Sequence, residues 1–193
     1  TLVALPLAPT SVVGLHWDEL LGQHLPLGDI GATDPDAICT IIYTSGTTGR
    51  PKGVVQTFGA MAWGLASATQ RIPISAGDRF ISYLPLAHVA ERMLVEQASL
   101  RFGGHVFFAE SLDTFLTDLQ RARPTIFFSV PRLWVKFRQG VFEKMPERRL
   151  KLLLSIPLLG TLVRRKILAG LGLDQCQLAA GGAAPMPADV LAF

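Results

Sequence analysis

Short apolar runs alternate with longer amphipathic segments through most of the chain. Four runs are rich in β-branched and aromatic residues, as buried strands are: 37–43, 79–84, 105–110 and 125–130. Helix-length segments follow three of them, at 88–100, 112–122 and 132–145. Continuous apolar strands separated by helices of this length predict a mostly parallel sheet flanked by helices on both faces, and therefore an α/β fold.

The first run is followed by a second short strand rather than directly by a helix. The sequence "GVVQT" (53–57) is strand-like, and Thr57 is placed to cap a helix over 58–70. The stretch between these two runs is therefore predicted to be a loop that joins two strands. A short helix is also expected around "HWDELL" (16–21), and a further strand at "CQLAA" (176–180).

The loop sequence "YTSGTTGRPKGVV" (43–55) has the composition of a phosphate-binding site. Gly46 and Gly49 allow positive φ and a close approach of the backbone to a ligand, and Lys52 adds a point charge. Hydroxyl groups beside free backbone N–H groups come from Ser45, Thr47 and Thr48, and a second cation from Arg50. A Walker A loop is excluded, because Lys52 follows a proline and leads into a strand. The alternative is a basic hairpin loop without a ligand.

Composition narrows the class of protein. At 193 residues, with 49% hydrophobic and 17% charged residues, the chain has enough apolar residues for one folded domain. Its net charge of +3 comes without a basic stripe interleaved with aromatic residues, which argues against nucleic acid as a partner. Cys39 and Cys176 show no metal-binding spacing, so we expect buried, reduced thiols in a cytoplasmic protein.

With these motifs, the sequence resembles the adenylate-forming (AMP-binding) enzymes. Their signature is a Thr/Ser/Gly-rich loop that ends in Pro-Lys-Gly, and "YTSGTTGRPKGVV" matches it throughout. Three other stretches resemble the long-chain fatty acyl-CoA synthetase branch: "SYLPLAHVAER" (82–92), "RPTIFFSVPRLWVKF" (123–137) and "LGLDQCQLAAGGAAPMPADVLAF" (171–193). The resemblance runs from about His16 to the end of the chain.

This resemblance implies ATP-dependent, Mg²⁺-dependent activation of a long-chain fatty acid to an acyl-adenylate, followed by transfer to coenzyme A. By similarity, Lys52 and His88 are catalytic, with His88 near the acyl carboxylate and the Thr44 hydroxyl as a Mg²⁺ ligand. The ATP phosphates would be held by Thr44, Ser45, Gly46, Thr47, Thr48, Gly49 and Lys52. The adenine and ribose would lie along Gly181, Gly182, Ala183, Ala184 and Pro185.

The sequence also departs from the family pattern. Family members continue to a Tyr-Gly-x-Thr-Glu motif whose Glu completes the magnesium site, to a ribose-binding Asp, and to a small domain with a catalytic Lys. None of these follows the "GGAAP" segment here. We therefore expect residues 1–193 to be a single incomplete AMP-binding domain that forms no acyl-CoA by itself. Gly181 stands where many relatives have Ser, which removes one hydroxyl from the adenine side.

Two further patterns each allow two interpretations. His88 and Glu91 are spaced to share a helical face, and a local hydrogen-bonded pair is favoured over a metal site. The segment 147–173 carries six cations around an apolar core of 12 residues, too short to span a bilayer. It is either an interfacial segment on the anionic inner face of a membrane or two amphipathic helices, broken near Pro157 and Gly160, that pack on the domain. The second interpretation is favoured.

The function hypotheses come from two classes. The first is the fatty acyl-CoA synthetase described above, whose partners are the small molecules fatty acid, ATP and coenzyme A. One alternative is a ligase for another hydrophobic or aromatic carboxylic acid. The other is a nucleotide-binding or membrane-associated module without turnover.

Overall fold

The strands of the protein pair in twos, and most of the pairs are parallel. The computed structural model describes residues 3–4, 15–26, 28, 31, 33–44 and 50–193. The parallel pairs are β1 (Val3–Ala4) with β2 (Leu15–His16), β5 (Arg79–Ser82) with β6 (His105–Phe108), and β7 (Ile126–Ser129) with β8 (Leu178–Gly181). The one antiparallel pair in this part of the chain is β3 (Ile38–Thr44) with β4 (Lys52–Thr57). The α/β class and its parallel strands are thereby confirmed.

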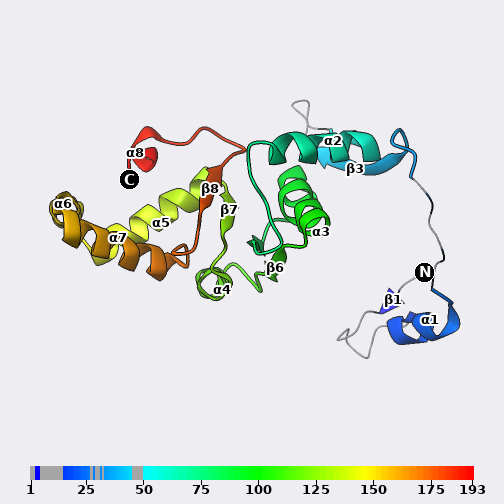
Figure 1. Ribbon diagram of the computed structural model, residues 1–193, viewed down its shortest axis with the longest axis horizontal. Coiled ribbons are helices and arrows are strands. Elements are labelled where there is room, and N and C mark those ends of the chain that lie inside the picture. The colour runs from blue at the N-terminus through cyan, green and yellow to red at the C-terminus, as the bar shows by residue number, and fades with distance from the viewer. Residues whose placement is uncertain (1–2, 5–14, 27, 29–30, 32, 45–49) are drawn as a thin grey trace.

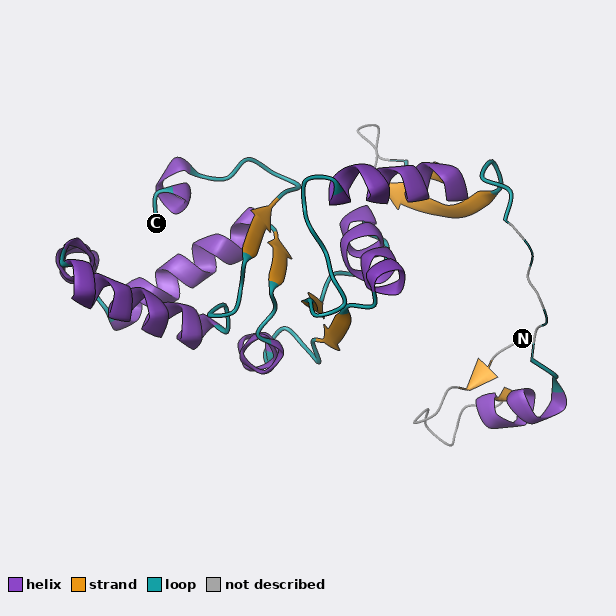
Figure 2. Cartoon of the chain, viewed as in Figure 1, coloured by secondary structure: helices purple, strands orange, loops and turns teal. Residues whose placement is uncertain are grey.

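Helices connect the strands of the two larger parallel pairs, β5 with β6 and β7 with β8, as Figures 1 and 2 show. Those before β6 are α1 (Trp17–Gln23), α2 (Phe58–Thr69), the π-helix η1 (Glu91–Gln97) and α3 (Ala98–Phe102). Those after β6 are α4 (Phe115–Ala122), α5 (Pro131–Lys144), α6 (Glu147–Ser155), α7 (Pro157–Leu171) and α8 (Ala188–Leu191). In the part of the chain that the structure describes, each helix is too short or too polar to cross a bilayer.

The two larger parallel pairs adjoin through the beginnings of β5 and β7. The Arg79 N–H donates to Thr125 Oγ1 (2.9 Å), and the Thr125 N–H donates to the Arg79 carbonyl (3.0 Å). Asp78, just before β5, accepts a hydrogen bond from the Thr125 hydroxyl at 2.6 Å. A buried polar network therefore fixes the position of one strand pair against the other.

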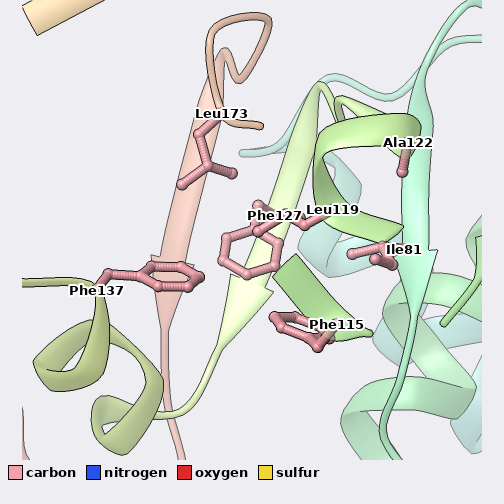
Figure 3. Packing of buried hydrophobic residues seen from close by; sticks show 7 residues of the cluster. All are labelled: Ile81, Phe115, Leu119, Ala122, Phe127, Phe137 and Leu173. Carbon is pink, nitrogen blue, oxygen red and sulfur yellow. The ribbon is translucent and has the colours of Figure 1, made fainter. Parts of the chain in front are cut away.

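Helices cover both faces of these strands. Successive side chains of a strand point to opposite faces, so neighbouring residues of one strand pack against different helices. Ile81 and Phe127 face a cluster that includes residues of α4 and α5, whereas Phe80 and Ile126 face Leu65 of α2 and Ala98 of α3. Figure 3 shows the first cluster, in which Phe127 lies between residues of α4 and α5. Its buried members are Ile81, Phe115, Leu119, Ala122, Phe127, Phe137 and Leu173.

The segment 147–173 forms two helices, as the favoured interpretation expects, but one predicted break point is wrong. The helices separate at Ile156, so that Pro157 is the first residue of α7. Gly160 lies inside α7 and is buried, and a Cβ atom there would come within 2.7 Å of the Leu154 carbonyl oxygen. Gly160 therefore allows the backbones of α6 and α7 to approach closely, instead of ending a helix.

Candidate nucleotide-binding site

The β3–β4 hairpin holds the two ends of the predicted phosphate loop. Thr44 ends β3 and Lys52 begins β4, and the register of the strands places the two residues opposite each other. Side chains of directly opposite residues in an antiparallel pair lie on the same face, about 5 Å apart at Cβ. The Thr44 hydroxyl donates a long hydrogen bond of 3.4 Å to the Lys52 carbonyl, which leaves its oxygen free to accept or to ligate. Both residues are exposed.

Five predicted phosphate-binding residues cannot be placed. They lie outside the described residues and are Ser45, Gly46, Thr47, Thr48 and Gly49. The structure therefore places the base of the loop, where Arg50, Pro51 and Lys52 are all exposed. Their roles on the ATP phosphates stay predictions.

The base of the hairpin is tied to α2 by the predicted cap. The Ala60 N–H donates to Thr57 Oγ1 at 3.1 Å, so the last residue of β4 caps α2, which begins at Phe58. Gly53 has no room for a side chain, because a Cβ atom there would lie 2.9 Å from a methyl group of Ile41. These contacts hold Lys52 at a defined position relative to the helix.

The predicted adenine segment begins at the carboxyl end of β8. Gly181 is the last residue of that strand, and the Gly182 N–H donates to the Ser129 carbonyl at the end of β7 (3.1 Å). A Cβ atom on Gly182 would lie 2.8 Å from the Phe128 ring. The backbone of this segment is therefore fixed against β7, and a larger side chain at Gly182 would displace it.

Two residues of the same segment show local constraints. Ala183 has a φ of 68°, a left-handed conformation that few non-glycine residues adopt. A Cβ atom on Gly181 would lie 2.6 Å from the Met186 methyl group, so a serine at position 181 would require Met186 to move. Met186 therefore fills the space that a side chain at position 181 would occupy. The strained Ala183 is the kind of outlier found at ligand sites.

His88 is exposed and lies in the turn that leads from β5 into a helix spanning residues 89–102. Its N–H donates to the Pro85 carbonyl (2.8 Å), and its own carbonyl accepts from the Glu91 N–H (3.1 Å). His88 and Glu91 thus meet through a backbone hydrogen bond. Among the described residues, no three His, Cys, Asp or Glu side chains are grouped so that they could hold a metal ion.

Glu91 is a buried carboxylic acid in the π-helical turn. Its exposed fraction is 2%, its Oε1 atom has no hydrogen-bond partner, and it lines a small cavity of about 30 Å³ with apolar neighbours. Burial raises the pKa of Glu91 above its ordinary value of 4.5, although hydrogen bonds from Ser82 and Leu84 and the nearby His88 oppose this effect. Ionisation of Glu91 is therefore costly in the folded protein.

We expect Glu91→Gln to stabilise the protein at neutral pH, because the glutamine side chain carries no charge that burial would penalise. The folded-state pKa of Glu91 is raised, so the penalty for ionisation is complete above that pKa and disappears as the pH falls toward 4.5. Urea unfolding of both proteins at several pH values measures the effect. An advantage of the variant that is equal at pH 4 and pH 7 would contradict this account.

Sequence reasoning missed two aromatic residues beside these segments. The Tyr83 hydroxyl is 3.2 Å from Ser129 Oγ and 3.3 Å from the Phe128 carbonyl, where β5 and β7 end, and burial raises its pKa. The Trp134 indole nitrogen is buried without a partner in the described structure, 3.5 Å from where a Cβ of Gly181 would lie. The sequence feature that could have identified them is their position shortly after predicted strands, within "SYLPL" and "SVPRLW".

The predicted site residues all follow the carboxyl ends of strands, where ligands of open α/β sheets bind. Thr44 ends β3, His88 follows β5, and Gly181 ends β8. In the described part of the chain, no hydrogen bond or ion pair joins Thr44 or Lys52 to His88 or to residues 181–185. The structure thus brings Thr44 and Lys52 together and leaves the shared crevice a prediction.

The two cysteines are free, as expected, but neither is fully buried. Cys39 and Cys176 are both intermediate in exposure. The Cys176 thiol donates to the Leu178 carbonyl at 3.2 Å, and burial raises its pKa. A thiol with a raised pKa is less reactive than an exposed one, so Cys176 is suited to a structural role.

Comparison with known proteins places this arrangement in a family. The family model of the AMP-binding enzyme matches residues 12–193. A long-chain-fatty-acid–CoA ligase of Gallus gallus is 32% identical over 92% of the chain, and a peroxisomal long chain acyl-CoA synthetase of Arabidopsis thaliana is 38% identical over 68% of it. The A-PCP didomain of carboxylic acid reductase from Segniliparus rugosus, in complex with AMP, superposes with a TM-score of 0.67 at 29% identity over 92% of the chain.

The chain corresponds to only part of each of these proteins. It covers 28% of the Gallus gallus ligase, 19% of the Arabidopsis thaliana synthetase and 25% of the carboxylic acid reductase didomain. Within that part, the family match includes the loop between β3 and β4, the turn with His88, and the segment after β8. The chain belongs to the AMP-binding enzyme family.

Proposed function

We propose that this chain is part of an acid–thiol ligase that activates a long-chain fatty acid with ATP and transfers the acyl group to coenzyme A. The observation that carries the proposal is Thr44 opposite Lys52 at the base of a loop whose sequence is the adenylate-forming signature. The fatty-acid specificity is supported by the long-chain-fatty-acid–CoA ligases among its relatives.

The proposed reaction has two steps. In the first, a carboxylate oxygen attacks the α-phosphorus of ATP, the bond to the β-phosphate oxygen breaks, and pyrophosphate leaves. In the second, the thiol of coenzyme A loses its proton to solvent, its sulfur attacks the acyl carbon, and AMP leaves with the electron pair of the bond that is broken. Negative charge accumulates on phosphate oxygens in the first step, so positioning and electrostatic stabilisation should dominate catalysis there.

The residues at the base of the loop suit that task. Lys52 is exposed, and β4 fixes its backbone, so its ammonium can reach phosphate oxygens without displacing packed structure. The Thr44 hydroxyl is a hard oxygen ligand of the kind Mg²⁺ accepts together with substrate phosphates. When bound, Mg²⁺ would neutralise charge on those phosphates. Thr44 supplies one oxygen only, so most of the ligands would come from ATP and water.

The segment after β8 suits a flat base. Gly181, Gly182, Ala183 and Ala184 carry at most a methyl group, so the adenine and ribose can lie against backbone. Pro185, which follows, fixes the direction in which the chain leaves this surface. We place His88 near the acyl carboxylate, because it follows the carboxyl end of β5 and is exposed.

The test of this proposal is substitution at the base of the loop in the whole protein, including any sequence beyond these residues. We expect Lys52→Ala or Thr44→Ala to slow acyl-adenylate formation at least tenfold, about 1.4 kcal/mol of transition-state stabilisation. Exchange of labelled pyrophosphate into ATP, dependent on added fatty acid, measures this step. Lys136→Ala, at an exposed lysine of α5, is the matched control and should leave the exchange unchanged.

The same assay separates the alternative functions. Exchange that is faster with an aromatic acid than with palmitate would favour a ligase for another hydrophobic acid, as the match to a carboxylic acid reductase allows. A protein that binds ATP but catalyses no exchange with any acid would be the non-catalytic module. Normal exchange in both loop variants would contradict the roles assigned to Thr44 and Lys52.

The location of the protein is part of the proposal. Fatty acids partition into membranes, so a ligase that uses them benefits from working at a bilayer surface. We place the protein in the cytoplasm, peripheral on the inner face of a membrane, where anionic lipids are concentrated. Two free cysteines support a reducing compartment.

A further inference from the structure

The helix pair α6–α7 projects at one end of the molecule, next to α5 (Figure 1). Leu150 of α6 is 2% exposed, and Gly160 of α7 is buried against the backbone of α6. The inner faces of the two helices are thus buried by packing within the protein. At the turn between them, the Gly160 N–H donates to the Ile156 carbonyl at 2.6 Å, and a Cβ atom on Gly160 would lie 2.7 Å from the Leu154 carbonyl oxygen.

The opposite faces of both helices are apolar and exposed. Leu158 and Leu162 are four residues apart, on the side of α7 away from Gly160, and their exposed fractions are 85% and 62%. On α6, Leu152 lies on the side away from Leu150 and is 66% exposed, and Ile156 at the turn is 46% exposed. Large aliphatic side chains exposed to water on the outer side of a helix mark an interaction surface. We call these four residues the aliphatic ridge.

Cations flank the aliphatic ridge on both helices. The segment 147–171 contains six cations, all exposed: Arg148, Arg149, Lys151, Arg164, Arg165 and Lys166. It contains one acidic residue, Glu147, which pairs with Lys151 at 2.8 Å. The other five cations have no ion pair with any described residue. The surface around the ridge is therefore strongly positive.

We propose that the aliphatic ridge and its flanking cations form a docking surface for an anionic phospholipid bilayer. The leucines would enter the boundary between headgroups and acyl chains, and the cations would contact lipid phosphates. The proposal deepens the function proposed above and rests on it for its purpose, since a membrane is where a long-chain fatty acid is collected. The binding itself depends on the surface alone.

Charge decides between a bilayer and a protein partner as the occupant. Arg164 lies on the inner side of α7, where it lines a cavity with Trp134 and Phe137, which leaves four unpaired cations around the ridge. Burying these four under a protein face would require as many acidic groups on that face, whereas an anionic bilayer supplies phosphates at any position. The geometry agrees, because α7 has 15 residues and is about 22 Å long, shorter than the roughly 30 Å hydrocarbon core. A helix of this length with cations on its outer face lies in the interface rather than across the bilayer.

The test is co-sedimentation of the whole protein with vesicles of phosphatidylcholine alone and with 30% phosphatidylglycerol. We expect binding to the anionic vesicles only, at least tenfold weaker at 1 M than at 0.1 M salt because the Debye length falls from about 10 to 3 Å. The variant R148Q/R149Q/R165Q/K166Q should bind at least about tenfold more weakly, since each cation near the surface contributes to the attraction. The variant L158S/L162S should lose binding to a similar extent.

Matched controls keep the result specific. Leu100 of α3 is 81% exposed, and Lys136 and Lys144 are exposed cations of α5, so L100S and K136Q/K144Q remove the same groups elsewhere. Both should bind like the unaltered protein. Equal binding to neutral vesicles, equal losses in the controls, or self-association through Leu158 and Leu162 without vesicles would each overturn the proposal.

The docking surface and the proposed activity can fail separately. Octanoate is water-soluble, so pyrophosphate exchange with octanoate needs no membrane and should be unchanged in all these variants. If the unaltered protein shows no exchange with any acid yet binds anionic vesicles through the ridge, the proposed function is wrong and the docking surface stands. If exchange is normal and vesicle binding is absent, the docking surface is wrong and the function stands.

Discussion

Replacing Phe127 by alanine should lower the free energy of unfolding by about 4 kcal/mol, the largest effect expected of any single substitution considered for this protein. Phe127 is 1% exposed and contacts three other aromatic rings: Tyr83, Trp134 and Phe137, with centroid distances of 6.4, 5.4 and 6.3 Å. Figure 3 shows its ring between α4, α5 and the neighbouring strands. Alanine would leave a cavity, and the surrounding helices and strands are too closely packed to move in and fill it.

The measurement is urea unfolding followed by tryptophan fluorescence, to which Trp134 contributes directly because it packs on Phe127 edge to face. Phe127→Leu should cost less than alanine, because part of the volume is kept. Phe108→Ala is the matched control: it is also a strand phenylalanine, but 78% exposed, and should change stability by less than about 1 kcal/mol. Equal losses at positions 108 and 127 would show that β7 is not the centre of the core.

The strands around Phe127 were predictable from sequence because burial on both faces leaves a simple pattern. In the runs "RFISYL" and "TIFFSV" large apolar residues stand next to each other instead of alternating with polar ones, and the structure shows why: Phe80 and Ile126 pack in one core, Ile81 and Phe127 in the other. The Thr57 cap was equally visible, since capping depends on residues that are adjacent in the chain. These features depend on residues that are neighbours in the chain, so they can be predicted from the sequence.

Features that depend on distant parts of the chain were not predictable in the same way. The segment 91–97 winds as a π-helix although nothing in "ERMLVEQ" differs from an ordinary helix. Composition predicts a helix end near Gly160, yet the approach of α6 makes it an interior residue of α7. In each case the deciding contact comes from tertiary packing, which overrides local propensity.

The candidate site also combines features that neighbouring residues determine with features that tertiary packing determines. The loop motif could be recognised because its glycines, hydroxyl groups and lysine match the adenylate-forming signature in order. The pairing of Thr44 with Lys52 could not, because seven residues separate them and the strand register alone brings them together. Tyr83 and Trp134 were missed for a related reason, since a single aromatic residue after a strand has no pattern until its neighbours are known.

The second large effect is expected at Asp78, where Asp78→Ala should lower the free energy of unfolding by about 3 kcal/mol at neutral pH. The Asp78 carboxylate is buried and accepts hydrogen bonds from the Thr125 hydroxyl (2.6 Å) and from the Ser75 N–H and hydroxyl (2.7 and 3.0 Å). Thr125 in turn accepts from the Arg79 N–H. Alanine would leave the buried Thr125 hydroxyl without its acceptor at the point where β5 meets β7, and would also remove both hydrogen bonds from Ser75.

The loss should depend on pH in a direction opposite to that for Glu91. Burial by itself raises the pKa of Asp78, but the hydrogen bonds from Thr125 and Ser75 outweigh it and hold the pKa below 3.8. A lowered folded-state pKa means that the stabilisation is complete above the unfolded-state pKa and is lost as the pH falls through the folded one. The difference in unfolding free energy between the native protein and Asp78→Ala should therefore be constant from about pH 6 to 8 and shrink between about pH 5 and pH 2.

Urea unfolding across that pH range measures the difference, with Asp113→Asn as the control because Asp113 is exposed in the loop before α4. The control should cost less than about 0.5 kcal/mol at any pH. A loss at Asp78 that does not change with pH would mean that the side chain stabilises the protein by shape rather than as a carboxylate. Thr125→Val provides the partner test: because it removes the same hydrogen bond from the other side, combining it with Asp78→Ala should cost less than the sum of the two single losses.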